Sequence, residues 1–228
     1  MEVLLVGDSL GMVFQGHTST LPVTMESMVY HTTCVARGIH HALLIADLPF
    51  LSYTSPDRAL DNAGHLMAAG ARMVKLEGGS APVLATVRHL GQWGIPVCAH
   101  LGLLPQSVHK LGGYRVQGRE PDQAATILND ALALEEAGAE LLVLECVPIA
   151  LAQQISAALK IPTIGIGAGV HCDGQVLVLY DMLGIVTGKR PRFSRNFMPG
   201  SNSVREAVAI FVREVKEGTF PGAEHSYT

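Results

Sequence analysis

Several short apolar segments of this chain carry charged side chains at or near their carboxyl ends. The segments are VLLVGDSLG (Val3 to Gly11), LLIADLP (Leu43 to Pro49), MVKLEGG (Met73 to Gly79), VCAHLG (Val97 to Gly102) and LLVLEC (Leu141 to Cys146). The charged residues in them are Asp8, Asp47, Lys75, Glu77, His100 and Glu145. Carboxylates are the hard oxygen ligands that a Mg²⁺ ion prefers, and three of these acids, Asp8, Asp47 and Glu77, are candidates to hold one.

A metal site of this kind suits chemistry on a 2-oxo acid. The ion would chelate the ketone and carboxylate of the acid, acidify the proton on C3 and stabilise the enolate. Lys75 would supply a fixed cation for the substrate carboxylate or the enolate. Glu145, across the site, would remove the C3 proton as a general base.

Each of these residues also has an ordinary structural interpretation. One acid at a strand end more often caps a helix or pairs with a base, but four at corresponding positions favour a functional site, because packing rarely tolerates so many together. Lys75 could merely neutralise Glu77. His100 fits an active-site residue and a hydrogen-bonded core histidine equally well.

The apolar segments predict strands of a parallel sheet. A run of branched apolar residues without alternation is typical of a strand buried on both faces. Helical patterns separate the strands, over about residues 25–37, 56–69, 82–93, 122–137, 175–183 and 203–217. Further strands are predicted near Thr163 and Ile185, which makes seven. The spacing predicts an α/β barrel, in which the carboxyl ends of the strands surround one mouth and carry the chemistry.

Two long segments are predicted to lie over this mouth. Residues 9–24 follow Asp8 with little helix signal, and long loops at such positions usually cover a site. Residues 101–121 contain Gly112, Gly113 and Gly118, so they could hinge as a lid. The GIGAG motif at 165–169 lacks the spacing of a dinucleotide fingerprint, and a close approach to a ligand and a plain tight turn both remain open.

Composition narrows the class of protein. A chain of 228 residues suits one α/β domain, 1–228. With 48% hydrophobic and 16% charged residues, self-association is expected. The net charge of -4 predicts neither nucleic acid nor an anionic membrane as a partner. Four cysteines without a C-x-x-C pair favour reduced thiols in a cytoplasmic protein, and no apolar segment approaches the roughly 20 residues of a membrane span.

Nine motifs in order carry a family resemblance: VGDSLGM, STLPVT, ADLPF, VKLEGG, AHLGLLPQS, GGYRVQGR, LECVP, IGIGAG and FPGAEHSY. With these, the chain resembles the ketopantoate hydroxymethyltransferase family from about Val3 to its C-terminus. The resemblance implies a (β/α)8 TIM barrel of the phosphoenolpyruvate mutase/isocitrate lyase type. It also implies a Mg²⁺-dependent reaction on small-molecule substrates that moves a one-carbon unit from 5,10-methylenetetrahydrofolate to 3-methyl-2-oxobutanoate and gives 2-dehydropantoate for pantothenate synthesis.

The family's functional residues map onto the strand ends already singled out, with one addition. By resemblance, Asp8 and Asp47 are Mg²⁺ ligands and Glu77 is the third acidic residue of the metal site. The implied contacts with the oxo acid are Asp8, Ser9, Asp47 and Lys75, of which only Ser9 comes from the resemblance alone. Glu145 matches the proton acceptor and His100 an active-site histidine. Family members are cytoplasmic homo-oligomers, commonly decamers.

The chain departs from the family pattern at its N-terminus. The family carries roughly 35 to 40 more residues there, with a first helix and the first barrel strand. We therefore expect that a first βα unit is missing, that the barrel has an open edge, and that the 228-residue form is poorly soluble or inactive. Two alternatives stay open: an inactive truncated paralogue with a role in oligomerisation, and another metal-dependent 2-oxo acid lyase or mutase.

Overall fold

The computed structural model describes residues 1–185, 188 and 190–228. Its centre is one sheet of parallel strands that follow one another in chain order. The strands are β1 (Val3–Val6), β2 (Leu43–Asp47), β3 (Met73–Glu77), β4 (Val97–Gly102), β5 (Leu141–Glu145), β6 (Thr163–Ile166) and β7 (Gly174–Gln175). Strand, helix and strand alternate along the chain, so the predicted α/β class is confirmed.

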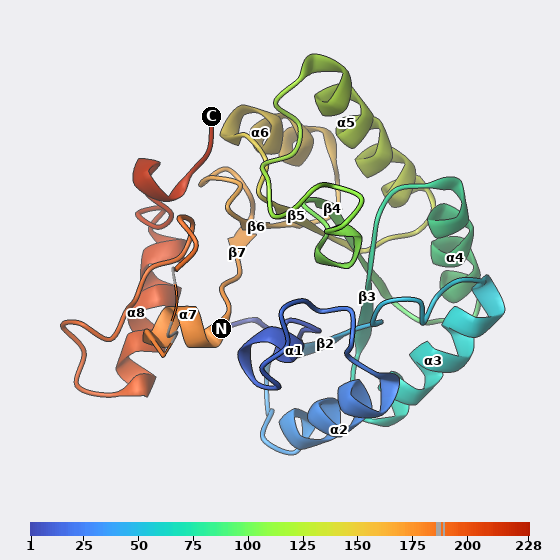
Figure 1. Ribbon diagram of the computed structural model, residues 1–228, viewed down its shortest axis with the longest axis horizontal. Helices are drawn as coiled ribbons and strands as arrows, with labels where there is room; N and C mark the ends of the chain where they lie inside the picture. The colour runs from blue at the N-terminus through green and yellow to red at the C-terminus, as the bar shows by residue number, and fades with distance from the viewer. Residues whose placement is uncertain (186–187, 189) are drawn as a thin grey trace.

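Helices surround the curled sheet on its outer side. They are α2 (Met25–Ala36), α3 (Pro56–Ala68), α4 (Ala81–Gln92), α5 (Pro121–Glu136), α6 (Ile149–Ala158), α7 (Leu179–Leu183) and α8 (Val204–Lys216). The short α1 (Leu10–Val13) lies inside the arc that these helices form (Figure 1). In Figure 1, α2 to α6 form an arc around the sheet, and α7 and α8 lie on the opposite side. No helix in the described part of the chain has the length and apolar character needed to cross a lipid bilayer.

Helix starts follow the capping signals in the sequence. The Thr24 side chain accepts a hydrogen bond from the Ser27 N–H at the start of α2. Ser55 does the same for Arg58 at the start of α3, where Pro56 occupies the first turn. Side-chain oxygens at these positions satisfy N–H groups that have no partner within the helix. The local sequence therefore determines where these helices begin.

Side-chain alternation places the charged residues on the inner face of the sheet. A core cluster inside the curl contains Ile45, Met73, Cys98, Leu141 and Val143. The residues an even number of positions further along the same strands share that face. They are Asp47, Lys75, Glu77, His100 and Glu145. The outer face, with residues such as Leu44 and Val74, packs in a second core cluster against the helices.

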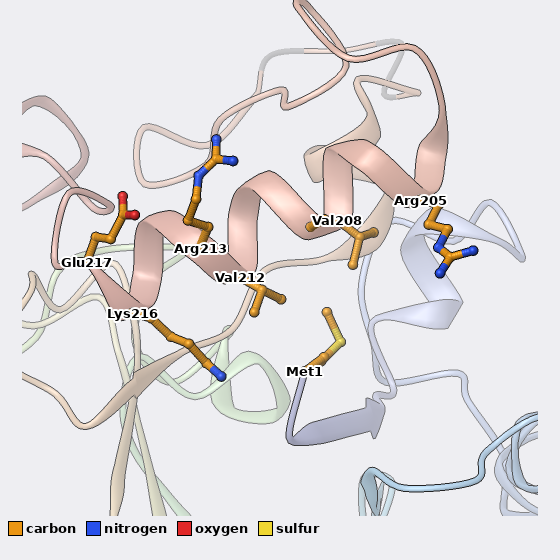
Figure 2. Close-up of a pocket in the computed structure, with 8 residues that line it drawn as sticks. Met1, Arg205, Val208, Val212, Arg213, Lys216 and Glu217 are labelled. Carbon is orange, nitrogen blue, oxygen red and sulfur yellow. The ribbon is translucent and has the colours of Figure 1, made fainter.

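The sheet has two outer edges in the described residues, because no backbone pairing there joins β1 to β7. A cavity of about 530 Å³ lies beside the start of β1, between Met1 and α8. Figure 2 shows Val208 and Val212 of α8 facing Met1 across it. None of the candidate catalytic residues lines this cavity, so it is separate from the charged inner face.

Two local predictions were wrong, and a third falls largely outside the described residues. Residues 9–24 are not loop throughout, because α1 follows Ser9 directly and packs the buried Leu10 and Gly11 into the core. The helix expected over 175–183 begins only at Leu179, and Gln175 belongs to β7. The strand expected around Ile185 borders residues 186–187 and 189, which lie outside the described residues, and Ile185 itself has no strand assignment.

Gly102 at the end of β4 permits the close approach of β5. Its φ of 95° is in the region that disfavours other residues, and a Cβ there would overlap the backbone oxygen of Glu145. We expect Gly102→Ala to lower the free energy of unfolding by roughly 2–5 kcal/mol, measured by urea denaturation. Gly91→Ala is the control, since a Cβ at Gly91 in α4 meets no atom within 4 Å. Equal stability of the two variants would contradict this explanation.

Candidate active site

Asp8, Asp47 and Lys75 form the first part of the site, at the carboxyl ends of β1, β2 and β3. The Asp8 N–H donates a 3.0 Å hydrogen bond to Asp47 Oδ2. The other oxygen, Asp47 Oδ1, lies 2.7 Å from Lys75 Nζ. All three side chains are almost completely buried. The ion-pair partner of Lys75 is thus Asp47, where the sequence had suggested Glu77 as the residue that it might neutralise.

Glu77, His100 and Glu145 form the second part, at the ends of β3, β4 and β5. His100 Nδ1 lies 3.5 Å from Glu77 Oε1, and His100 Nε2 lies 3.3 Å from Glu145 Oε2. These are charge contacts, since among the described residues neither ring nitrogen has an aligned hydrogen-bond partner. His100 is therefore placed between two carboxylates instead of in an apolar part of the core.

Gln106 joins the two parts, and the sequence reasoning missed it. Its Nε2 donates to Asp8 Oδ2 at 2.8 Å, and its backbone N–H donates to Glu77 Oε2 at 3.0 Å. A continuous set of contacts consequently runs from Lys75 through Asp47, Asp8, Gln106, Glu77 and His100 to Glu145. The only sequence signal was the position of Gln106 in the motif AHLGLLPQS, within the predicted lid.

Backbone hydrogen bonds anchor the segment that carries Glu145. Cys146, the next residue, has a φ of 47° and is buried. The Cys146 N–H donates to the Ile166 oxygen, and its own oxygen accepts from the Gln117 N–H, both at 2.9 Å. The Glu145 oxygen accepts from the Leu103 N–H at 2.8 Å. These bonds fix the position of Glu145, whose side chain is only 16% exposed.

Burial and like charge dominate the electrostatics of the acids. Burial, followed by the negative charge of Asp47, raises the pKa of Asp8 to about 8, although Lys75 opposes this shift. Burial disfavours the charged form of Lys75, but Asp47, Glu77 and Asp8 outweigh it and raise the Lys75 pKa. Burial and Lys75 also oppose protonation of His100, but the Glu145 and Glu77 carboxylates raise the His100 pKa to about 9. Acids exceed bases in this site.

A single divalent cation fits this excess of negative charge. No three His, Cys, Asp and Glu side chains of the described residues are grouped so that they alone could hold a metal ion. Mg²⁺ does not need such a cage, because it is usually bound by one or two carboxylates together with water and substrate oxygens. The carboxylates of Asp8 and Asp47, which come from neighbouring strand ends joined by the bond from the Asp8 N–H to Asp47, provide that arrangement.

The raised pKa of Asp8 has a consequence for stability. Because the folded protein keeps this proton to higher pH than the unfolded chain does, its stability without metal should fall as the pH rises from about 4 to about 8. Urea unfolding in EDTA at several pH values would measure this. Asp8→Asn lacks the titrating group, so the stability difference between wild type and variant should shift against wild type with rising pH. If the unfolding free energies of wild type and Asp8→Asn changed in parallel with pH, the raised pKa of Asp8 would be contradicted.

Part of the 101–121 segment lies over this end of the sheet. In Figure 1 it runs in front of β4 and β5, inside the arc of helices. Gly112, Gly113 and Gly118 all adopt positive φ, a conformation that glycine tolerates better than other residues. The hydroxyl of the exposed Tyr114 lies 3.3 Å from Met12 Sδ in α1. Half-buried Ser9 precedes α1 on the same side, next to Asp8.

Solved structures share this fold at low sequence identity. Phosphoenolpyruvate phosphomutase from Streptomyces platensis superposes with a TM-score of 0.57 at 12% identity, over 94% of this chain and 76% of that chain. A 2,3-dimethylmalate lyase, described as a member of the PEP mutase/isocitrate lyase superfamily, gives 0.53 at 14% identity over 98% and 75%. These likenesses show the fold alone, and they confirm the predicted TIM-barrel-like fold.

Relatives identified by sequence have a far higher identity to this chain. The 3-methyl-2-oxobutanoate hydroxymethyltransferases of Shewanella loihica and of Shewanella sp. strain W3-18-1 are 59% and 58% identical over 228 residues, which is 100% of this chain and 86% of each relative. The family model of ketopantoate hydroxymethyltransferase matches residues 1–223. The chain therefore belongs to the ketopantoate hydroxymethyltransferase family.

Proposed function

We propose that this hydroxymethyltransferase uses 5,10-methylenetetrahydrofolate and Mg²⁺ to convert 3-methyl-2-oxobutanoate into 2-dehydropantoate. Membership of the family supports hydroxymethyl transfer in pantothenate biosynthesis as the reaction. The observation that carries the finer proposal is the continuous set of contacts from Lys75 to Glu145 on one inner face of the sheet. It brings a cation, a carboxylate pair and a candidate base into one site.

Asp8 and Asp47 are the proposed ligands of Mg²⁺, and Glu77 is the third acidic residue of the metal site. Once bound, the ion would act as a Lewis acid on the keto and carboxylate oxygens of the oxo acid and acidify the proton at C3. The Lys75–Asp47 ion pair and the hydrogen bond from the Asp8 N–H hold the two Asp47 oxygens in place. The site is thus arranged before substrate arrives.

Lys75 and Ser9 are the proposed polar contacts of the oxo acid, together with Asp8 and Asp47. The raised pKa of Lys75 keeps its ammonium charged in a buried site. A fixed positive charge there stabilises both the substrate carboxylate and the negative charge that develops as the C3 proton leaves. Half-buried Ser9 offers a hydroxyl next to Asp8.

Glu145 is the proposed acceptor of the C3 proton. It is the most exposed carboxylate of the site, so substrate can reach it, while its backbone is fixed by neighbouring strands. His100 contacts Glu145 on one side and Glu77 on the other. Its raised pKa makes it a cation at neutral pH, so a positive charge lies beside the Glu145 carboxylate. Removal of the proton prepares C3 to bond to the one-carbon unit.

The remaining features of the proposal concern the whole protein. We infer one domain over 1–228, because one sheet and its helices account for the described elements. A cytoplasmic homo-oligomer, a decamer by family resemblance, is consistent with exposed apolar side chains such as Phe14, Tyr30 and Trp93. The free cysteines fit a reducing compartment.

An assay of the complete reaction tests the proposed function. The purified chain is first shown to be folded by circular dichroism, then incubated with 3-methyl-2-oxobutanoate and 5,10-methylenetetrahydrofolate, and the product is followed by NMR. Because the open edge of the sheet is expected to impair this form, we expect 2-dehydropantoate to form slowly, but above the uncatalysed rate, with Mg²⁺ and to stop forming in EDTA. Folded protein that forms no product with Mg²⁺, or equal product in EDTA, would contradict the proposal.

A further inference from the structure

Gln106 has hydrogen bonds to residues of three neighbouring strand ends. Its side chain is 6% exposed, and its Nε2 donates both to Asp8 Oδ2 at 2.8 Å and to the Leu48 backbone oxygen at 3.0 Å. Its Oε1 accepts a 2.5 Å hydrogen bond from the Tyr53 hydroxyl. Its backbone N–H donates to Glu77 Oε2 at 3.0 Å. A neutral residue thus contacts two of the three acids of the proposed metal site.

The hydrogen bonds determine which way the amide faces. The Leu48 backbone oxygen can only accept, so the NH₂ group must face it, and the second hydrogen of that group is donated to Asp8 Oδ2. The Tyr53 hydroxyl then donates to the carbonyl oxygen on the other side. A carboxylate at this position could not donate to Asp8, and an apolar side chain would leave three buried polar groups without this partner. Glutamine satisfies all of them.

Fixing one oxygen of Asp8 fixes the plane of its carboxylate. The Asp8 backbone is already tied to Asp47, so the bond from Gln106 leaves its second oxygen in a defined place. Residues that orient metal ligands in this way commonly change metal affinity when they are replaced. Gln106 also lies in the 101–121 segment, so it links that segment to the carboxylates.

We propose that Gln106 is a positioning residue that orients Asp8 for the divalent cation, and that Tyr53 acts through Gln106 by holding its amide. This inference rests on the proposed function, in which Asp8 and Asp47 bind the metal. Tyr53 is suited to its part because it reaches Gln106 from the segment that follows β2 and Asp47. Neither residue needs to touch the substrate.

Binding of Mn²⁺ alone, measured by water proton relaxation on the whole chain without substrate, tests the inference. Gln106→Met should weaken Mn²⁺ binding by about 10- to 100-fold. Tyr53→Phe keeps the amide and should weaken it by about 3- to 10-fold. The double variant should be no weaker than Gln106→Met, because Tyr53 has no effect except through the amide. In turnover assays, the Mg²⁺ concentration for half-maximal rate should rise in the same order.

A matched control separates positioning from general stability. Asn62 in α3 donates through its carboxamide to the Ser52 backbone oxygen at 2.6 Å, a partly buried amide contact that involves none of the acids of the site. Asn62→Leu should leave Mn²⁺ binding unchanged within about twofold. If Gln106→Met does not fold, Tyr53→Phe and the control still decide the question. Unchanged binding in Tyr53→Phe, or an equal loss in Asn62→Leu, would overturn the inference.

The same experiment distinguishes this inference from the proposed function. Asp47→Asn removes a proposed ligand and should abolish measurable Mn²⁺ binding. If wild type binds Mn²⁺ and Asp47→Asn does not, while the Gln106 and Tyr53 variants bind normally, only the positioning role is wrong. If wild type and Asp47→Asn bind equally, the metal site itself is wrong, and the inference falls with it.

Discussion

Asp47→Asn should lower turnover by about 10³-fold or more and also destabilise the fold. Asp47 is a proposed metal ligand and the ion-pair partner of Lys75, whose side chain is 5% exposed. Loss of the carboxylate charge leaves a buried ammonium without its main partner, which costs about 3–5 kcal/mol. Loss of a charge that binds the metal removes transition-state stabilisation as well. Steady-state kinetics and urea unfolding measure the two effects separately.

Asp57→Asn is the matched control for this prediction. Asp57 is also paired, with His89 Nε2 at 3.5 Å, but its side chain is 93% exposed. Exposed ion pairs contribute about 0–1 kcal/mol, so this variant should keep both its stability and its turnover. Asp47→Asn with normal turnover would remove Asp47 from the site. Normal stability would show that the Lys75–Asp47 pair matters less than its burial indicates.

Glu145→Gln should lower turnover by about 10²- to 10⁴-fold, the range that a general base contributes. The fold should be little affected, because the backbone bonds of Glu145 and its neighbours remain and an amide occupies nearly the same volume. Glu140→Gln is the control, since Glu140 is exposed and lies just before the opposite end of β5. If Glu145→Gln kept wild-type turnover, a residue other than Glu145 would have to accept the C3 proton.

The strands and most of the site could be predicted from the sequence. Branched apolar runs identify β1 to β5, and parallel strands bring their carboxyl ends together, which is why Asp8, Asp47 and Glu145 were found. In contrast, β7 is only Gly174 and Gln175, a pair with no apolar run, and its strand character depends on pairing with β6. Such a strand has no local signal.

The site residues that could not be predicted from the sequence were missed for the same reason: no local signal marks them. Gln106 is neutral and lies 98 residues from Asp8, 53 from Tyr53 and 29 from Glu77. Its role comes from hydrogen bonds that exist only after the sheet has curled and the 101–121 segment has packed against it. Charged residues reveal a site through their cost of burial, whereas a neutral amide that satisfies them does not.

Proton exchange at C3 of 3-methyl-2-oxobutanoate, followed by NMR in D₂O without folate, tests the central claim most directly. It isolates proton removal from the transfer that follows. We predict exchange in wild type with Mg²⁺, little exchange in EDTA, and none above the uncatalysed rate in Glu145→Gln. Exchange that persists in both EDTA and Glu145→Gln would contradict a site in which carboxylates hold a metal and Glu145 takes the proton.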